Sequence, residues 1–222
     1  MTTINLLLFV LLGLILATYT SANPTNRHNE NLVLYVNAPQ KCCTPYQWHA
    51  NISRVERLTF KSNPLQFEVM GQMWFDGKNE RTAVHAIVQN GHPEVVTMIQ
   101  DFKANKHYTI HNTYKKCEVG PIVYPKPERC IPDDAEFLGE EILGESLKVN
   151  SWKAPFKGKT YDVKTHFTMT DTCIPVTSTM SGILSSPVGK VHMLRMTTTF
   201  NFKDGIKDFS IFDIPSYCNK EL

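Results

Sequence analysis

The sequence has little net charge and lacks the common catalytic motifs. Its 222 residues carry a formal net charge of +2, and Lys115-Lys116 is the only adjacent basic pair. This balance gives no electrostatic case for nucleic-acid binding, which needs a basic patch. The chain also has neither a Gly-x-Ser-x-Gly nucleophile elbow nor the His-Glu-x-x-His motif of zinc hydrolases. These absences predict a protein that is not an enzyme and does not bind nucleic acid.

Only one long apolar run is present, and it lies at the start of the chain. Residues 6–17 have the length of a signal-peptide hydrophobic region, and small residues at 20–22 supply a cleavage site near Asn23. The run is shorter than the roughly 20 apolar residues that a spanning helix needs. We therefore expect a signal peptide over residues 1–22, a single domain over 23–222 and no transmembrane segment.

Cysteines and one glycosylation motif both indicate export. The chain has six cysteines, namely Cys42, Cys43, Cys117, Cys130, Cys173 and Cys218. An even number behind a signal peptide is typical of a disulfide framework, although six cysteines alone allow about 15 pairings. Asn51-Ile52-Ser53 is the one sequon without proline at its second position, so we expect a glycan at Asn51.

Alternation of apolar and polar residues predicts a mainly β fold. The expected strands lie at residues 67–75, 82–89, 95–102, 107–114, 161–170, 173–184 and 191–202. Turn residues at 76–79 and 90–93 join the first of these as antiparallel neighbours. No composition break or internal repeat divides the chain. We therefore expect one antiparallel domain of about eight to eleven strands, either a sandwich or a half-barrel.

Four prolines between Cys117 and Asp133 predict an irregular crossover, which Cys130 would pin. Acidic residues at 133–136 could begin a short helix, which Gly139 and Gly144 would keep short. Neither this acidic group nor the one at 204–213 has the spacing of an EF-hand loop, so no calcium ligands are assigned.

Several short motifs are spread along the chain from residue 42 to residue 218. They are Cys42-x-x-Pro45-x-x-Trp48, Trp152 ahead of Thr172-Cys173-Ile174-Pro175-Val176, Gly205-Ile206-Lys207-Asp208-Phe209-Ser210-Ile211-Phe212 and Pro215-Ser216-Tyr217-Cys218. Their order and spacing resemble the ependymin family, and specifically the ependymin-related proteins of mammals and invertebrates. The closing block carries the resemblance most specifically, because both its order and its distance from the last cysteine match.

The resemblance implies the disulfides Cys42–Cys173 and Cys117–Cys218. It leaves Cys43 and Cys130 for a third bridge, and the adjacent Cys42 and Cys43 could exchange partners. It also implies a strongly curved antiparallel sheet, similar to that of bacterial lipoprotein carriers, which partly encloses an apolar cavity. Members of the family are secreted glycoproteins, commonly dimeric, found in extracellular fluid or lysosomes and associated with calcium and lipid-like ligands.

On this basis we expect a non-enzymatic carrier of a hydrophobic small molecule or lipid. A second copy of the chain is the expected protein partner, and calcium is the one cofactor considered. The alternative is an extracellular matrix or cell-adhesion glycoprotein with a calcium-sensitive surface and no ligand pocket.

Apolar strand residues are the candidates for the lining of such a cavity. They are Met70, Trp74, Met98, Phe102, Phe167, Met196 and Phe200. Two of them belong to the even positions of residues 191–202, which form the mostly apolar face of that strand. The competing interpretation is that these side chains fill a packed core.

Overall fold

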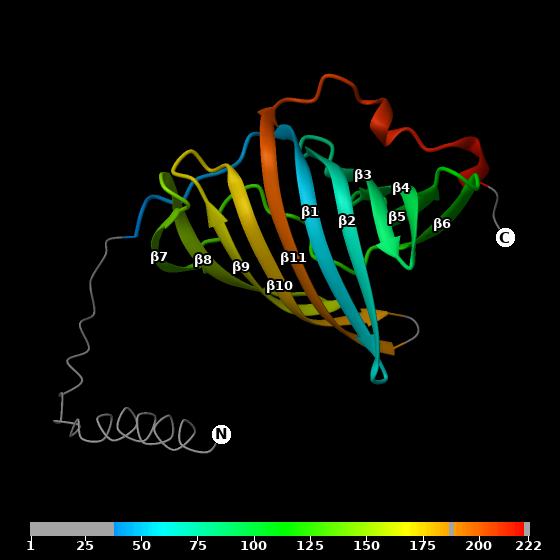
Figure 1. The fold of residues 1–222 in the computed structure, drawn as a ribbon, viewed down its shortest axis with the longest axis horizontal. Helices are drawn as coiled ribbons and strands as arrows, with labels where there is room; N and C mark the ends of the chain where they lie inside the picture. Colours follow the sequence, from blue (N-terminus) through cyan, green and yellow to red (C-terminus); the bar gives the residue numbers. More distant parts are fainter. Residues whose placement is uncertain (1–37, 187–188, 220–222) are drawn as a thin grey trace, which may run out of the picture. The chain divides into compact units, whose positions relative to one another are not determined.

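The protein is described by a computed structural model that covers residues 38–186 and 189–219 (Figure 1). The expected signal peptide, residues 1–22, lies outside the described residues. The strands are β1 (Gln47–Phe60), β2 (Asn63–Asp76), β3 (Arg81–Asn90), β4 (His92–Asp101), β5 (Lys106–His111), β6 (Lys116–Pro121), β7 (Glu136–Leu143), β8 (Leu147–Lys157), β9 (Tyr161–Met169), β10 (Pro175–Ser186) and β11 (Gly189–Asp204). Two short 3₁₀ helices follow, η1 (Ser210–Phe212) and η2 (Ser216–Asn219).

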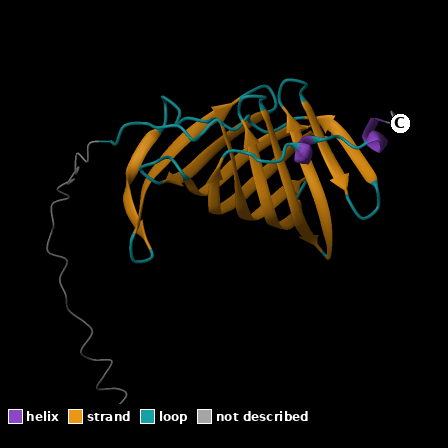
Figure 2. Ribbon diagram, turned by 90° about the horizontal axis from the view of Figure 1, so that it is seen from above, coloured by secondary structure: helices purple, strands orange, loops and turns teal. Residues whose placement is uncertain are grey.

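All eleven strands belong to one antiparallel sheet that curves strongly and does not close (Figure 2). The spatial order is β6-β5-β4-β3-β2-β1-β11-β10-β9-β8-β7, so two meanders meet where β1 pairs with β11. This arrangement confirms the predicted mainly β fold in its half-barrel form, with an irregular crossover. The last strand of the first meander, β6, and the first strand of the second, β7, are the opposite edges of the sheet.

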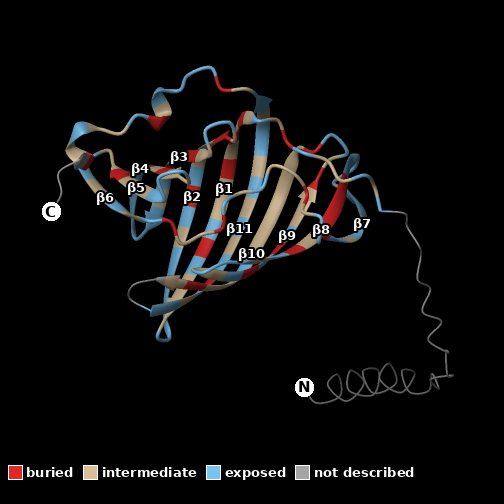
Figure 3. Cartoon of the chain, turned by 180° about the vertical axis from the view of Figure 1, so that it is seen from behind, coloured by how far each residue is buried: buried red, intermediate tan, exposed pale blue. Residues whose placement is uncertain are grey.

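The crossover between these edges, residues 122–135, therefore has to traverse the whole sheet. Ten inter-strand spacings of ~4.8 Å amount to about 48 Å, and 14 residues reach at most about 50 Å when fully extended. Because the sheet curves, its two edges lie closer together than this across the concave side, where the crossover runs and includes a turn in which the Ala135 backbone N–H donates to the carbonyl of Pro132 at 3.1 Å. The crossover contacts the sheet through Tyr124, whose hydroxyl donates to Glu56 Oε1 at 3.0 Å. Buried crossover residues, among them Ile122, Pro125 and Ile131, are interspersed with exposed ones in the view coloured by burial (Figure 3).

The side of the sheet under the crossover is called the inner face, and the opposite side the outer face. Ile52, Glu56 and Arg195 lie on the inner face, whereas Ser53 and Met196 lie on the outer face, because successive strand residues alternate between faces. The C-terminal segment covers part of the outer face. Its residues Ile206, Phe212 and Cys218 are buried against Ala83, Ile99 and Ile110 of β3, β4 and β5.

One local prediction is wrong: the acidic segment starting at residue 133 does not form a helix. Residues Glu136–Leu143 form strand β7, paired with β8. The Phe137 ring packs against Trp152 with ring centroids 5.0 Å apart, and Lys148 forms an ion pair with Glu140 at 2.6 Å. These tertiary contacts outweigh the weak local preference for a helix.

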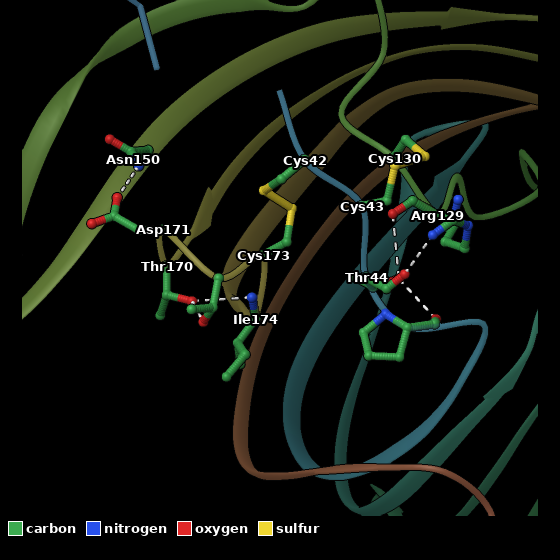
Figure 4. Close-up of a disulfide and its surroundings, with 12 residues drawn as sticks. Cys42, Cys43, Thr44, Arg129, Cys130, Asn150, Thr170, Asp171, Cys173 and Ile174 are labelled. Carbon is green, nitrogen blue, oxygen red and sulfur yellow. Dashed lines mark hydrogen bonds between the residues drawn. A yellow bond between two sulfur atoms is a disulfide. The ribbon is translucent and has the colours of Figure 1, made fainter. Parts of the chain in front are cut away.

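Three disulfides join the pairs Cys42–Cys173, Cys43–Cys130 and Cys117–Cys218. The first and third are the pairs that the family resemblance implied, and Cys43–Cys130 joins the two cysteines that it left over. The neighbouring cysteines 42 and 43 point toward different partners (Figure 4). Around them, the Thr44 backbone N–H donates to the carbonyl of Arg129 at 2.8 Å, and Arg129 Nη1 donates to the carbonyl of Thr44 at 2.9 Å. The end of the crossover is therefore fixed to the start of the first meander.

Two glycines on the inner face lie where the backbones of neighbouring strands approach closely. A Cβ on Gly71 of β2 would meet the carbonyl oxygen of His85 and would lie 2.5 Å from Ala86 Cα on β3. Gly182 of β10 has the same relation to β9, where a Cβ would lie 2.7 Å from Val163 Cα, and its φ of +152° also favours glycine. Glycine at such sites permits the close backbone approach that a strongly curved sheet requires.

We predict that Gly71→Ala lowers the free energy of unfolding by about 2 kcal/mol, because strands β2 and β3 must separate to admit a methyl group. Chemical denaturation measures this change. Gly120→Ala on β6 is the matched control, since a Cβ there has nothing within 4 Å. Its effect should stay within about 0.5 kcal/mol. Equal effects of the two substitutions would show that the crowding at Gly71 does not constrain the sheet.

Candidate functional site

A pocket of about 540 Å³ lies on the inner face, between strands of the first meander and the crossover. Its lining comprises Arg54, Glu56, Leu58, Phe67, Val69, Met73, Thr82, Val84, Val88, Asn90, His92, Glu94, Val96, Met98, Gln100, His107, Thr109, His111, Tyr124, Pro125, Lys126, Pro127, Phe156, Met180 and Arg195. The volume falls within the roughly 300–1,000 Å³ of typical small-molecule sites. A second hollow, lined by residues such as Asp133 and Lys157, is more open and polar.

The floor of the pocket is apolar. Val69, Val84 and Val96 are buried side chains of β2, β3 and β4, and Met73 and Met98 pack beside them. They share one face because the register places Met73 opposite Val84 and Val84 opposite Met98. Methionine side chains adapt to ligands of different shape. This part of the site suits a flexible apolar group.

A buried ion pair forms the polar end of the pocket. Arg195 of β11 donates to both oxygens of Glu56 on β1, from Nε at 3.0 Å and from Nη2 at 2.9 Å. The Tyr124 hydroxyl donates to the same carboxylate, and the Arg195 guanidinium lies 4.3 Å from the centre of the Tyr124 ring. Two sheet strands and the crossover thus meet at one carboxylate.

The electrostatics of this cluster follow from burial and close opposite charge. Burial alone would raise the pKa of Glu56, but the charge and hydrogen bonds of Arg195, the charge of Arg54 and the Tyr124 hydrogen bond together hold that pKa below its usual value. Burial raises the pKa of Tyr124 to about 12, so the phenol stays protonated and donates a hydrogen bond. Burial and the neighbouring Arg195 lower the pKa of Arg54 to about 10. Glu56, Arg54 and Arg195 are therefore all ionised at neutral pH.

Histidines lie on the β5 side of the pocket. His111 Nδ1 lies 2.8 Å from Glu94 Oε1. His107 Nε2 lies 3.0 Å from Thr109 Oγ1, while its Nδ1 is buried without a hydrogen-bond partner in the part of the chain that the structure describes. Burial lowers the pKa of His107, so this ring is neutral at pH 7. The lining offers hydrogen-bonding groups here without adding charge at His107.

Of the seven side chains expected to line a cavity, Met98 lines this pocket and the others do not. Met70, Met196 and Phe200 lie on the outer face and are 63%, 54% and 41% exposed. Trp74 packs under the C-terminal segment, Phe167 packs in the Trp152 cluster, and Phe102 follows β4.

The expectation that Met70, Met196 and Phe200 line the cavity was wrong. Alternation of apolar and polar residues shows that a strand has two faces, but it does not show which face the rest of the chain covers. On β11 the even positions are the more apolar, yet the inner face carries Met193 and Arg195. On β2 the inner residues are Phe67, Val69 and Met73. The sequence does contain a signal for the missed site: on β1, Arg54 and Glu56 occupy the same alternating phase as the apolar Ile52 and Leu58.

Within the described residues, no group of three or more His, Cys, Asp or Glu side chains is arranged to hold a metal ion. Calcium binding therefore stays a prediction with no assigned ligands. No helix of the described residues is long and apolar enough to cross a membrane.

The Ependymin family model matches residues 90–218 of this chain. The chain belongs to the ependymin family. It is similar to two proteins of Haliotis asinina, ependymin-related protein 1 at 27% identity over 190 residues and ependymin-related protein 2 at 25% over 186 residues. These matches cover 80% of this chain in both cases, and 90% and 89% of the relatives. The resemblance expected from the sequence motifs is thereby confirmed.

Among solved structures, this ependymin-family chain is similar to a DUF1329 family protein from Desulfovibrio piger. The identity is 9%, and the alignment covers 77% of this chain and 90% of that protein with a TM-score of 0.33. An overlap of that size carries no argument about function.

We predict that Glu56→Gln lowers the free energy of unfolding at pH 7 by about 3 kcal/mol, because it leaves Arg195 as a buried cation without a counter-charge. The native pKa of Glu56 is depressed, so its contribution is present above the unfolded value of about 4.3 and is lost as pH falls through the folded value. Denaturant titrations at pH 7 and pH 3 should show the difference between wild type and variant shrinking in acid.

Glu68→Gln is the control for this prediction, because Glu68 is an exposed carboxylate on the outer face of β2. It should change the unfolding free energy by less than about 0.5 kcal/mol at either pH. A difference for Glu56→Gln that stays constant from pH 7 to pH 3 would contradict the assigned charge state.

Proposed function

We propose that this chain is a non-enzymatic binding protein that holds a hydrophobic, lipid-like ligand in the inner-face pocket. The observation that carries the proposal is the apolar floor of β2, β3 and β4 beneath a crossover that leaves about 540 Å³ of space. An apolar cavity with a few placed polar groups is the usual form of a small-molecule site.

Catalysis has less support than binding at this site. The ionisable residues at its polar end hold one another: Glu56 accepts from both Arg195 and Tyr124, and Tyr124 keeps its proton. A general base or nucleophile needs a free, correctly poised group near the substrate. The proposed role is therefore to hold a ligand and not to convert it.

We further propose that the protein is exported and glycosylated. The three disulfides fit an extracellular environment. Asn51 of the sequon is half-buried on the outer face of β1, opposite Gln72 and Phe200, and so lies on the side away from the pocket. A glycan there would leave the binding site open. The predicted homodimer, calcium binding and matrix contacts, and a lysosomal location, remain predictions.

The pocket is tested by filling it. N-phenyl-1-naphthylamine, a neutral apolar fluorophore, should bind the wild-type protein with increased emission. Val88→Trp should weaken this binding by at least about tenfold, because Val88 lines the pocket and the larger ring occupies it. Fluorescence titration measures both. The control is Ile87→Trp, since Ile87 is the adjacent residue of β3 and is exposed on the outer face. Binding that survives Val88→Trp unchanged would place the probe elsewhere and refute the proposed site.

Glycosylation is tested on protein secreted from eukaryotic cells. Digestion with an N-glycosidase should lower the mass of the wild type and leave Asn51→Gln unchanged, because Asn51-Ile52-Ser53 is the one usable sequon. Mass spectrometry reads the difference. An undigested wild-type protein with the bare mass of the chain would show that the half-buried Asn51 is not modified.

A further inference from the structure

The polar end of the pocket carries one more positive charge than negative charge. Arg54 and Glu56 are two residues apart on β1 and share the inner face, and Glu56 lies directly opposite Arg195 on β11. Both oxygens of the Glu56 carboxylate are engaged by Arg195, at 3.0 and 2.9 Å. The three side chains together leave a charge of +1, which resides at Arg54.

Arg54 is held in place but forms no contact ion pair, and Glu56 attracts it only from a longer distance. Its Nε donates to Thr197 Oγ1 at 3.2 Å, which directs the rest of the guanidinium along the inner face. Across residues 38–186 and 189–219, no carboxylate lies within the 4.0 Å ion-pair distance of Arg54.

The other basic side chains of the lining differ from Arg54 in this respect. Lys126 at the rim pairs with Glu80 at 3.0 Å, and His111 pairs with Glu94 at 2.8 Å. His92 is an exposed residue at the start of β4. Arg54 is therefore the guanidinium of the lining that has no ion-pair partner among the described residues, and only its Nε is engaged in a side-chain hydrogen bond.

Arg54 also stands directly beside the apolar floor. It lies opposite Val69 in the register between β1 and β2, and Val69 in turn lies opposite Val88 on β3. A partly desolvated cation is unfavourable unless an opposite charge compensates it. A molecule with an anionic head and an apolar tail would meet both requirements at once, with its head at Arg54 and its tail across the valines.

We propose that the ligand of this pocket is a long-chain carboxylic acid whose carboxylate pairs with Arg54. The inference rests on the proposed function, because it names the chemical class of ligand for the same site. Guanidinium groups bind carboxylates through two parallel hydrogen bonds. The excess of one positive charge matches a monoanion, which favours a carboxylate over a dianionic phosphate.

The experiment compares two ligands that share a chain and differ in the head group. Dodecanoic acid and 1-dodecanol each compete against bound N-phenyl-1-naphthylamine at pH 7. The wild type should bind the acid about tenfold more tightly than the alcohol, the size expected for one charge-assisted contact. Arg54→Gln should weaken the acid by about tenfold and leave the alcohol within about twofold, whereas Arg54→Lys, which keeps the cation, should retain most of the preference.

Two matched substitutions control for charge and for the other nearby cation. Arg57→Gln removes the same charge from the exposed outer face of the same strand, and Lys126→Gln removes the amine at the rim. Both should keep the preference for the acid. Loss of the preference in Lys126→Gln would move the head group to the rim and overturn the assignment to Arg54.

The remaining outcomes separate this inference from the proposed function. If acid and alcohol compete equally in the wild type, the pocket binds apolar ligands and the assignment of an acidic head group is wrong. Equal weakening of both ligands by Arg54→Gln would show that Arg54 only supports the fold. Tighter binding of dodecyl phosphate than of dodecanoic acid would overturn the choice of a carboxylate. Failure of the fluorophore itself to bind the wild type would refute both proposals.

Discussion

The buried ion pair between Glu56 and Arg195, with the Tyr124 hydroxyl bound to the same carboxylate, fixes the geometry of the pocket. It joins three segments that are distant in sequence: the first strand, the last strand and the crossover. The crossover packs against the sheet where Val123 and Tyr124 contact the cluster of Val163, Leu184 and Met193. The crossover is attached at Tyr124 and at the Cys43–Cys130 disulfide. Between these two points, Pro125 and its neighbours line the pocket opposite the curved sheet. The space that remains is the pocket.

The same pair sets the electrostatics of the site. Burying Glu56 is unfavourable by itself, and its pKa is nevertheless lowered because Arg195, Arg54 and the Tyr124 hydroxyl together offset the desolvation. Because both oxygens of this carboxylate accept from Arg195 and Arg54 forms no contact ion pair with it, the cluster keeps an excess positive charge at Arg54. A single additional carboxylate on β11 or β2 would have neutralised Arg54 and made the polar end purely structural. Because no such carboxylate stands at the neighbouring inner positions, the cluster both stabilises the fold and provides a candidate site for the head group of a ligand.

Local patterning predicted strands at β2 to β5 and β9 to β11 and the irregular crossover, because period-two alternation and proline act within a few residues, but it did not predict β1, β6 or β8. It failed at β7, where the acidic segment is a strand only because β8 lies beside it. It also chose the wrong face at Met70 and Met196, since the sequence shows two faces and not which one the chain later covers. The polar cluster was missed because its partners, Glu56 and Arg195, are separated by 139 positions. A pair at that distance becomes visible only after the two meanders meet at β1 and β11.

A single sheet has two faces to cover, and this fold covers each with a segment that is not a strand. The crossover lies over the inner face and is tied by Cys43–Cys130, whereas the C-terminal segment lies over part of the outer face and is tied by Cys117–Cys218. In a sandwich a second sheet would supply this packing, but here each cover is only a short stretch of chain. Cross-links that close loops of this length can contribute roughly 4 to 5 kcal/mol each by restricting the unfolded chain. The disulfides therefore compensate for the limited packing of these two covering segments. Because the segment on the concave side is short, the curved sheet keeps a cavity there in place of a filled core.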